Sequence, residues 1–302
     1  MLEGWLQRLE IEAGAPARYE LVVAGDSAEA NTAEDILPLN PFVGSHLRIE
    51  FNGRITCSAC GAPTRRSYGE GHCYRCFRRL AACDLCVVSP VRCHYAQGTC
   101  REPAWGEAFC MRPHLVYLAN TSGAKVGITT QGGQLARWLD QGATQGLVIA
   151  RAATRHLAGV LEDRLARRVS DRTDWRALLS RDANPIDLPG LKGLLRETAG
   201  PLPAGVAWVE DEPVTVLRYP VQSYPRRLMR LRLEETGTVS GRLLGIKGQY
   251  LLFEHGVLNV RRHRSFHVQV RAADAAEPVL PGGAASVAAA TAGYSQMELF
   301  SE

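Results

Sequence analysis

The spacing of the cysteines constrains this chain more than any other feature. Among 302 residues there are nine cysteines, and two C-x2-C pairs, Cys57 with Cys60 and Cys73 with Cys76, are separated by twelve residues. Two such pairs can supply four thiolates to one tetrahedral ion at about 2.3 Å. The first residues show no basic segment followed by an apolar one, so we expect a cytoplasmic protein with reduced thiols. In that setting the four cysteines predict a structural zinc site.

A second group of cysteines follows the first. We predict that four of its members hold a second zinc ion: Cys83, Cys86, Cys93 and Cys100. Either of the last two can be replaced by one of three neighbours: Cys110, His94 and His114. Four protein ligands leave no open position for water, so both ions are expected to be structural.

Charge is distributed unevenly along the chain. The formal net charge is +4, but residues 1–52 carry −6, residues 53–271 carry +14 and residues 272–302 carry −4. A basic middle favours a polyanion as partner, and we expect nucleic acid. The alternative is an arginine-rich solvated surface. No stretch approaches the roughly 20 apolar residues of a membrane span, so no membrane partner is expected.

Changes in pattern along the chain predict an α+β multidomain protein of five parts. Alternating residues predict strands in the first part, whereas the alanine-rich last part is too poor in large apolar groups to pack and predicts a disordered tail. The parts are N-terminal β strands (1–52), a zinc-ribbon-like module (53–114), a ββαβα domain (115–199), a small β domain (200–271) and the tail (272–302).

Hydrophobic periodicity places the elements of the third part. The predicted order is strand Leu115–Ala119, strand Lys125–Thr129, helix Gln134–Gln141, strand Leu147–Arg151 and helix Thr154–Val169. In the fourth part we predict the strands Val239–Leu244, Gln249–Glu254 and Phe266–Val270.

The third part carries Val116-Tyr117-Leu118, then Lys125-Val126-Gly127, then Arg137 and Glu162 on successive helices. This set resembles the GIY-YIG endonuclease core. The resemblance implies that Tyr117 or Lys125 helps to deprotonate an attacking water, that Arg137 neutralises developing charge and that Glu162 binds magnesium or manganese. The chain departs from the family pattern in two places, because the first tripeptide lacks its leading glycine and Lys125 replaces the second tyrosine.

Over nearly its whole length the sequence also resembles a bacterial family known only as domain of unknown function 2797. The segments that carry this resemblance are 57–61, 71–76, 83–86, 93–95, 98–101, 125–129, 137–143 and 245–250. No activity is attached to that family, so the resemblance implies none.

The chain ends in Gln296-Met297-Glu298-Leu299-Phe300, with large apolar residues at the tip of a tail that otherwise has few. This peptide is similar to the motif with which bacterial replication and repair proteins bind the sliding clamp. The resemblance implies that Leu299 and Phe300 enter an apolar pocket and that Gln296 is fixed by hydrogen bonds, with Met297 as the aliphatic position.

Three functions follow from these features. The first is a zinc-containing, metal-dependent DNA endonuclease of repair or replication. The second is a non-catalytic nucleic-acid-binding or clamp adaptor with a decayed nuclease core, which would bind but not cleave. The third is a structural zinc protein with a protein partner, which salt-insensitive behaviour would distinguish from the other two.

Overall fold

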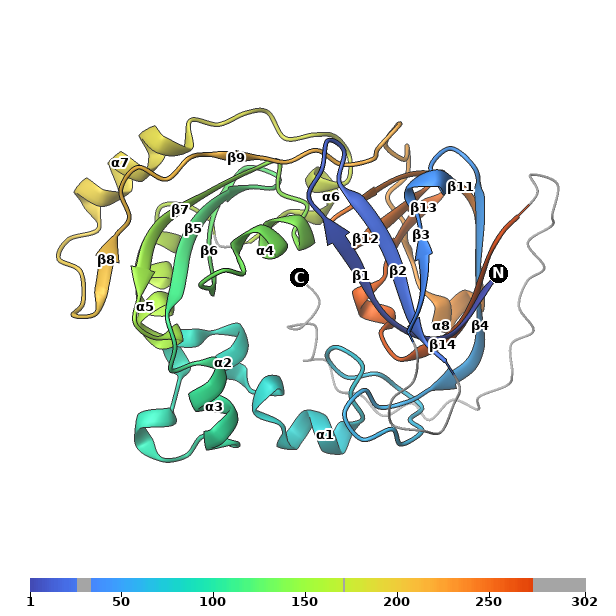
Figure 1. Ribbon diagram of the computed structural model, residues 1–302, viewed down its shortest axis with the longest axis horizontal. Helices are drawn as coiled ribbons and strands as arrows, with labels where there is room; N and C mark the ends of the chain where they lie inside the picture. The colour runs from blue at the N-terminus through green and yellow to red at the C-terminus, as the bar shows by residue number, and fades with distance from the viewer. Residues whose placement is uncertain (26–33, 171, 274–302) are drawn as a thin grey trace. The chain divides into compact units, whose positions relative to one another are not determined.

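The computed structural model describes residues 1–25, 34–170 and 172–273 (Figure 1). The chain forms two compact units. The first contains Met1–Glu10, Arg18–Cys76 and the segment that begins at Pro220, and the second contains Ile11–Ala17 and Phe77–Tyr219. The boundary after Cys76 lies inside the predicted zinc-binding segment 53–114. The two predicted zinc sites therefore belong to different units.

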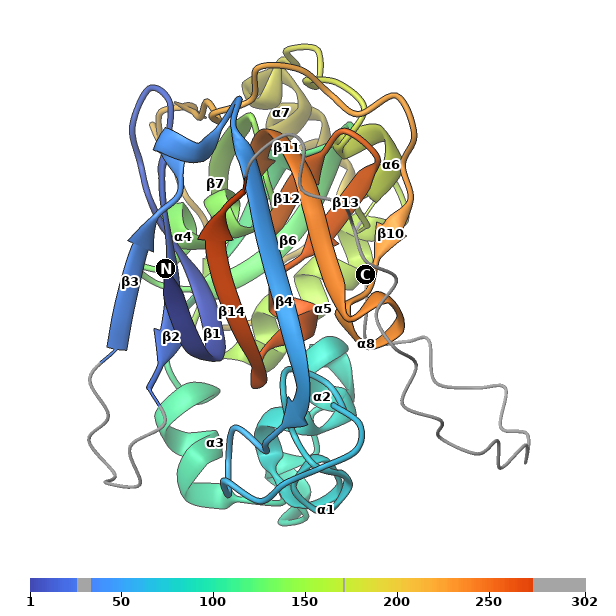
Figure 2. The same cartoon turned by 90° about the vertical axis from the view of Figure 1, so that its right-hand side faces the viewer.

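A nine-stranded sheet forms the core of the first unit, in the order β10-β13-β12-β11-β4-β14-β1-β2-β3. Figure 2 shows β4 between β14 and β11. Strands from both ends of the described chain thus share one sheet, in which Val270 of β14 pairs with Leu2 of β1 and with Ile49 of β4. The strands are β1 (Leu2–Glu12), β2 (Arg18–Ala24), β3 (Glu34–Pro38), β4 (His46–Ile55), β10 (Arg230–Leu231), β11 (Thr238–Lys247), β12 (Tyr250–Phe253), β13 (Gly256–Asn259) and β14 (Phe266–Ala272).

The second unit is built on a five-stranded sheet with the path β6-β5-β7-β8, to which β9 is added beside β7. Its strands are β5 (His114–Asn120), β6 (Ala124–Thr130), β7 (Gln145–Ala152), β8 (Val206–Trp208) and β9 (Thr215–Val216). Helix α4 (Gln134–Asp140) follows β6, and α5 (Arg155–Ala166) and α7 (Leu188–Thr198) follow β7. The strands and helices predicted between residues 115 and 169 coincide with β5, β6, α4, β7 and α5 within a few residues.

Alternation along the strands separates the two faces of this sheet, because successive side chains point to opposite sides. Val116 and Leu118 of β5 pack with Leu161 of α5 in the buried core. Tyr117, between them, points to the other face, where its ring meets Trp138 of α4 edge-on at 6.0 Å. Helices α5 and α4 therefore cover opposite faces (Figure 1).

The remaining helices are short: α1 (Tyr74–Arg79), α2 (Leu85–Val88), α3 (Pro103–Phe109), α6 (Trp175–Leu178) and α8 (Leu233–Thr236). In the part of the chain that the structure describes, no helix is both long enough and apolar enough to span a bilayer.

Candidate functional site

Four cysteines of the first unit lie together. The sulfur atoms of Cys57, Cys60, Cys73 and Cys76 are all within 4.8 Å of one another. The sulfurs of Cys60 and Cys73 are 3.9 Å apart, close to the roughly 3.8 Å expected between ligands of a tetrahedral zinc ion with 2.3 Å bonds. The predicted tetracysteine cluster is therefore present, and its donor set and spacing fit zinc.

Backbone N–H groups around the cluster stabilise the thiolate form of Cys57, which is the form that binds metal. Burial raises the pKa of the Cys57 thiol, but backbone N–H groups of Cys73, Ala59 and Cys60 aim at its sulfur and hold that pKa at about 6. Burial, reinforced by the other three thiols, raises the pKa of Cys76 to about 12. A bound cation would offset this burial cost, because thiolates are the form that binds metal.

The first C-x2-C pair lies within an antiparallel turn, and the second pair follows one. A backbone bridge closes each turn, Thr56 with Pro63 and Tyr68 with His72. The N–H of Ser58 in the first turn donates to the carbonyl of Gly71 in the second at 2.8 Å. This hydrogen bond joins the two turns and so keeps the two C-x2-C pairs next to each other.

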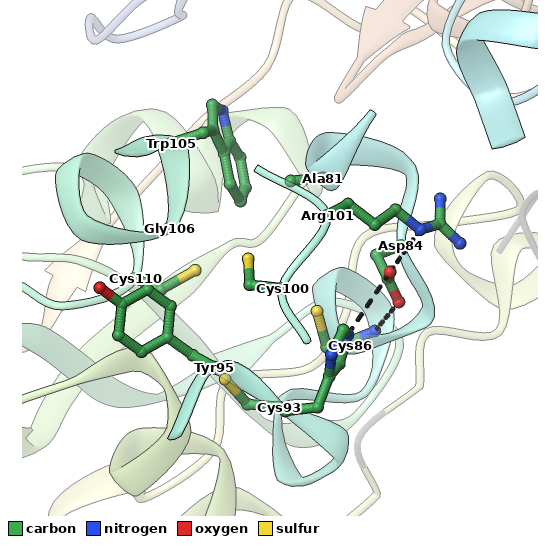
Figure 3. Close-up of a pocket in the computed structure, with 11 residues that line it drawn as sticks. Ala81, Asp84, Cys86, Cys93, Tyr95, Cys100, Arg101, Trp105, Gly106 and Cys110 are labelled. Carbon is green, nitrogen blue, oxygen red and sulfur yellow. Dashed lines mark hydrogen bonds and ion pairs between the residues drawn. The ribbon is translucent and has the colours of Figure 1, made fainter. Parts of the chain in front are cut away.

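The second group of cysteines lines a pocket in the second unit (Figure 3). Of the predicted ligands, Cys86, Cys93 and Cys100 line it, together with two of the predicted replacements, Cys110 and His94. Cys83 ends a short turn at Ala81–Cys83 and is not one of the lining residues. His114 does not line the pocket either; its Nδ1 lies 2.8 Å from the carbonyl oxygen of Arg112.

Tyr117 is the centre of a third group of side chains. It faces Gly127 across β5 and β6 and is fully buried. Its hydroxyl lies 3.1 Å from the amide oxygen of Gln141. With that amide turned toward Arg137, the oxygen accepts from Arg137 Nε at 3.1 Å as well as from the hydroxyl. Gln141 thus joins Tyr117 to Arg137.

Gln141 is a site residue that the sequence prediction missed. The available signal was its spacing of four residues from Arg137, which places the two on one face at the end of α4. A register shift against β7 between Val116 and Tyr117 also marks the site, since such irregularities re-aim a side chain.

Glu162 lies on α5, half-buried, within electrostatic range of the same group. Burial raises the pKa of the Tyr117 phenol, the Arg137 cation opposes the rise and the Glu162 carboxylate adds to it. The Glu162 carboxylate also contributes to raising the pKa of the Arg137 guanidinium. The structure therefore joins Tyr117 to Arg137, and it places Glu162 within electrostatic range of both.

Lys125 occupies a different place on the sheet. It lies on the Tyr117 face, two residues before Gly127, and only 7% of it is exposed. Its Nζ donates to the hydroxyl of Thr173 at 3.4 Å. Arg137, in contrast, is exposed, so Arg137 and Glu162 are the members of the predicted set that a ligand can meet in this structure.

The basic residues of α5 divide into two kinds. Arg164 donates to the backbone oxygens of Ala199 and Pro201 at 3.1 and 2.7 Å, and so supports the fold. Arg167 and Arg168, at the end of the helix, are exposed. These two are available to meet a phosphate backbone.

A family model described as "Protein of unknown function (DUF2797)" matches residues 44–268. The chain belongs to this family. The DUF2797 match covers both groups of cysteines and the Tyr117 group, whereas the clamp-like residues 296–300 lie beyond it and outside the described residues. Searches of curated proteins and of solved structures found no match. Because the DUF2797 description states no activity, the function has to be inferred from the geometry.

Proposed function

We propose that this protein is a zinc-containing, metal-dependent endonuclease that acts on DNA in repair or replication, in the cytoplasm. The observation that carries the proposal is the contact of Tyr117 and Arg137 through Gln141, with Glu162 within electrostatic range of both. These are three of the four positions that correspond to the GIY-YIG signature. They lie on three separate elements, β5, α4 and α5.

Arg137 and Glu162 would have different roles in cleavage. Arg137, exposed and oriented by Gln141, would neutralise charge on the scissile phosphate. Glu162 would hold a magnesium or manganese ion; one carboxylate suits such a site, because Mg²⁺ commonly binds through one or two carboxylates plus substrate phosphate. When bound, the ion would polarise the phosphate and activate water.

The burial of Tyr117 changes its expected role. A fully buried phenol with a raised pKa is a poor proton acceptor, so Tyr117 would orient Gln141 and Arg137 instead. Lys125 would then be the residue to take the proton from water, as a neutral amine and in a conformation that exposes its Nζ to the substrate.

A cleavage assay tests the proposal. Purified protein is incubated with branched, nicked, single-stranded and duplex DNA in the presence of Mg²⁺ or Mn²⁺. Cleavage by the parent and its loss in Glu162→Gln, with zinc content unchanged, would support the nuclease. Asp163→Asn is the matched control, because Asp163 is the next residue of α5, exposed, and pairs only loosely with Arg167 at 3.7 Å.

The second candidate function is a non-catalytic nucleic-acid-binding or sliding-clamp adaptor. The observation that favours it is the burial of both Tyr117 and Lys125, the two residues available to activate water. Equal DNA binding by the parent and by Glu162→Gln, with no cleavage under either metal, would select the adaptor over the nuclease.

A further inference from the structure

We propose that Cys86, Cys93, Cys100 and Cys110 hold a second structural metal ion, zinc, and that this ion braces the amino end of helix α5. This set differs from the sequence prediction in one ligand, since Cys110 replaces Cys83. The metal site stands by itself; its consequence for Glu162 rests on the proposed function.

The four thiols surround one pocket and come from separate segments. Cys86 lies on α2, Cys93 and Cys100 lie on the loops between α2 and α3, and Cys110 caps α3 (Figure 3). Their sulfur atoms are more widely spaced than those of the first cluster, which all lie within 4.8 Å of one another, so a bound ion would draw the four thiols together.

Gly106 leaves space for one of these thiols. A Cβ at position 106 would lie 3.3 Å from the sulfur of Cys100 and 3.0 Å from the ring of Tyr95. The glycine therefore allows α3 to approach Cys100 closely. Four thiols facing one pocket form the donor set that zinc prefers.

Asp84, Cys86 and His94 are a competing ligand set, because their donor atoms lie within 4.8 Å of one another. Asp84 is already engaged, however. It accepts from Arg101 Nε at 2.6 Å and from the backbone N–H of Cys86 at 3.4 Å, and it lies 3.5 Å from His94 Nε2. A metal on Asp84 would have to displace a guanidinium, so we assign Asp84 to the support of α2 and of the Cys86 ligand.

The segment that carries these cysteines is attached to the start of α5. The carbonyl of Cys110 accepts from the N–H of Arg155 at 2.8 Å, and the Arg155 side chain donates to the carbonyl of Val87. Further along α5, a Cβ on Gly159 would lie 2.4 Å from Pro90 Cβ, so only glycine permits this approach. Glu162 lies one turn beyond Gly159. An ion that fixes the segment would therefore fix the helix that positions Glu162.

Metal counting tests the site on the full chain. Protein purified with zinc is freed of loosely bound metal, and zinc per chain is measured by elemental analysis. We expect two zinc ions per chain in the parent and in Cys83→Ser. We expect one ion in Cys110→Ser, and also one in Cys60→Ser, because Cys60 belongs to the first cluster. One ion in the parent, or loss of an ion in Cys83→Ser with two retained in Cys110→Ser, would overturn the proposal.

A second variant covers the case in which Cys110→Ser does not fold. Cys110→His keeps a residue that can bind zinc, so the count of two should persist. In the cobalt(II)-loaded protein, two tetracysteine sites contain eight thiolates, and Cys110→His removes one of them. The thiolate charge-transfer absorption should therefore fall by about one part in eight. Unchanged absorption would show that Cys110 is not a ligand.

Hydrogen exchange separates the bracing of α5 from the nuclease proposal. Cys110→Ser should speed exchange of the amides at 155–160, whereas Cys60→Ser should leave them unchanged. Equal exchange in Cys110→Ser and the parent would refute the bracing. Neither this readout nor the zinc count depends on cleavage, so the site can stand even if the nuclease proposal fails.

Discussion

The hydroxyl end of Tyr117 lies over the backbone of Gly127, its partner across β5 and β6. A Cβ at Gly127 would be 2.5 Å from the Tyr117 hydroxyl oxygen and 2.6 Å from the ring carbon that bears it. Glycine at this position is therefore a packing requirement of the Tyr117 group. Gly127 therefore has a role in packing here, independent of any catalytic one.

Gly127→Ala should lower the free energy of unfolding by about 1–3 kcal/mol, because the buried ring of Tyr117 has to move. Urea unfolding measures the change. The control is Gly193→Ala on α7, where an added Cβ meets nothing within 4 Å. That substitution should raise stability by about 0.5–1 kcal/mol, as for an exposed helical glycine. A neutral Gly127→Ala would contradict the packing argument.

The pH dependence of stability should contain a contribution from Glu234. Burial raises the pKa of this carboxyl, but the contact with His263 and the hydrogen bond from Arg262 outweigh it and hold the pKa at about 2. The His263 Nε2 and Arg262 Nη2 atoms lie 3.2 and 3.0 Å from its oxygens. Because the folded pKa is below the ordinary value of 4.5, the stabilisation is complete above about pH 4.5 and is lost as pH falls toward 2.

Glu234→Gln should therefore remove about 1–2 kcal/mol of stability at neutral pH and reduce the fall in stability between about pH 5 and pH 2. Urea unfolding at several pH values checks this. Glu235→Gln serves as the control, because Glu235 is exposed and pairs with Arg232 at 2.8 Å on the surface. Parallel pH profiles for Glu234→Gln and the parent would rule the contribution out.

Binding to DNA should depend on Arg168 and not on Arg164. Arg168→Ala removes an exposed cation, so it should weaken binding and lower the salt slope of the affinity by about 1. Arg164→Ala should chiefly lower the melting temperature, because that side chain donates to backbone oxygens. Affinity titrations at several salt concentrations distinguish the two. An unchanged slope in Arg168→Ala would exclude a phosphate contact at this residue.

The C-terminal peptide should bind the bacterial sliding clamp. A synthetic peptide of residues 292–302 contains all four predicted contact residues, Gln296, Met297, Leu299 and Phe300. Fluorescence anisotropy should detect binding that is lost when Leu299 and Phe300 are replaced by alanine, because these two carry most of the apolar contact. Absence of binding at high micromolar peptide would remove the clamp from the proposal.

Local signals predicted much of the fold. Strands such as Leu115–Ala119 and Lys125–Thr129 coincide with β5 and β6, because alternation and flanking turn residues are properties of a few neighbouring positions. The strands of residues 1–52 and 238–272 were predicted as separate regions, yet they share one sheet. Pairing between strands so far apart depends on which edges meet, and no short window contains that information.

The sequence by itself determined the DUF2797 family and the first tetracysteine cluster, because C-x2-C spacing forces two thiols onto one turn whatever the rest of the chain does. Tertiary structure decided the other groupings. It placed Cys110 and not Cys83 at the second pocket, and it joined Tyr117 to Arg137 through Gln141. The physical reason is that these side chains come from separate elements, so their distances depend on how α3, α4 and α5 pack.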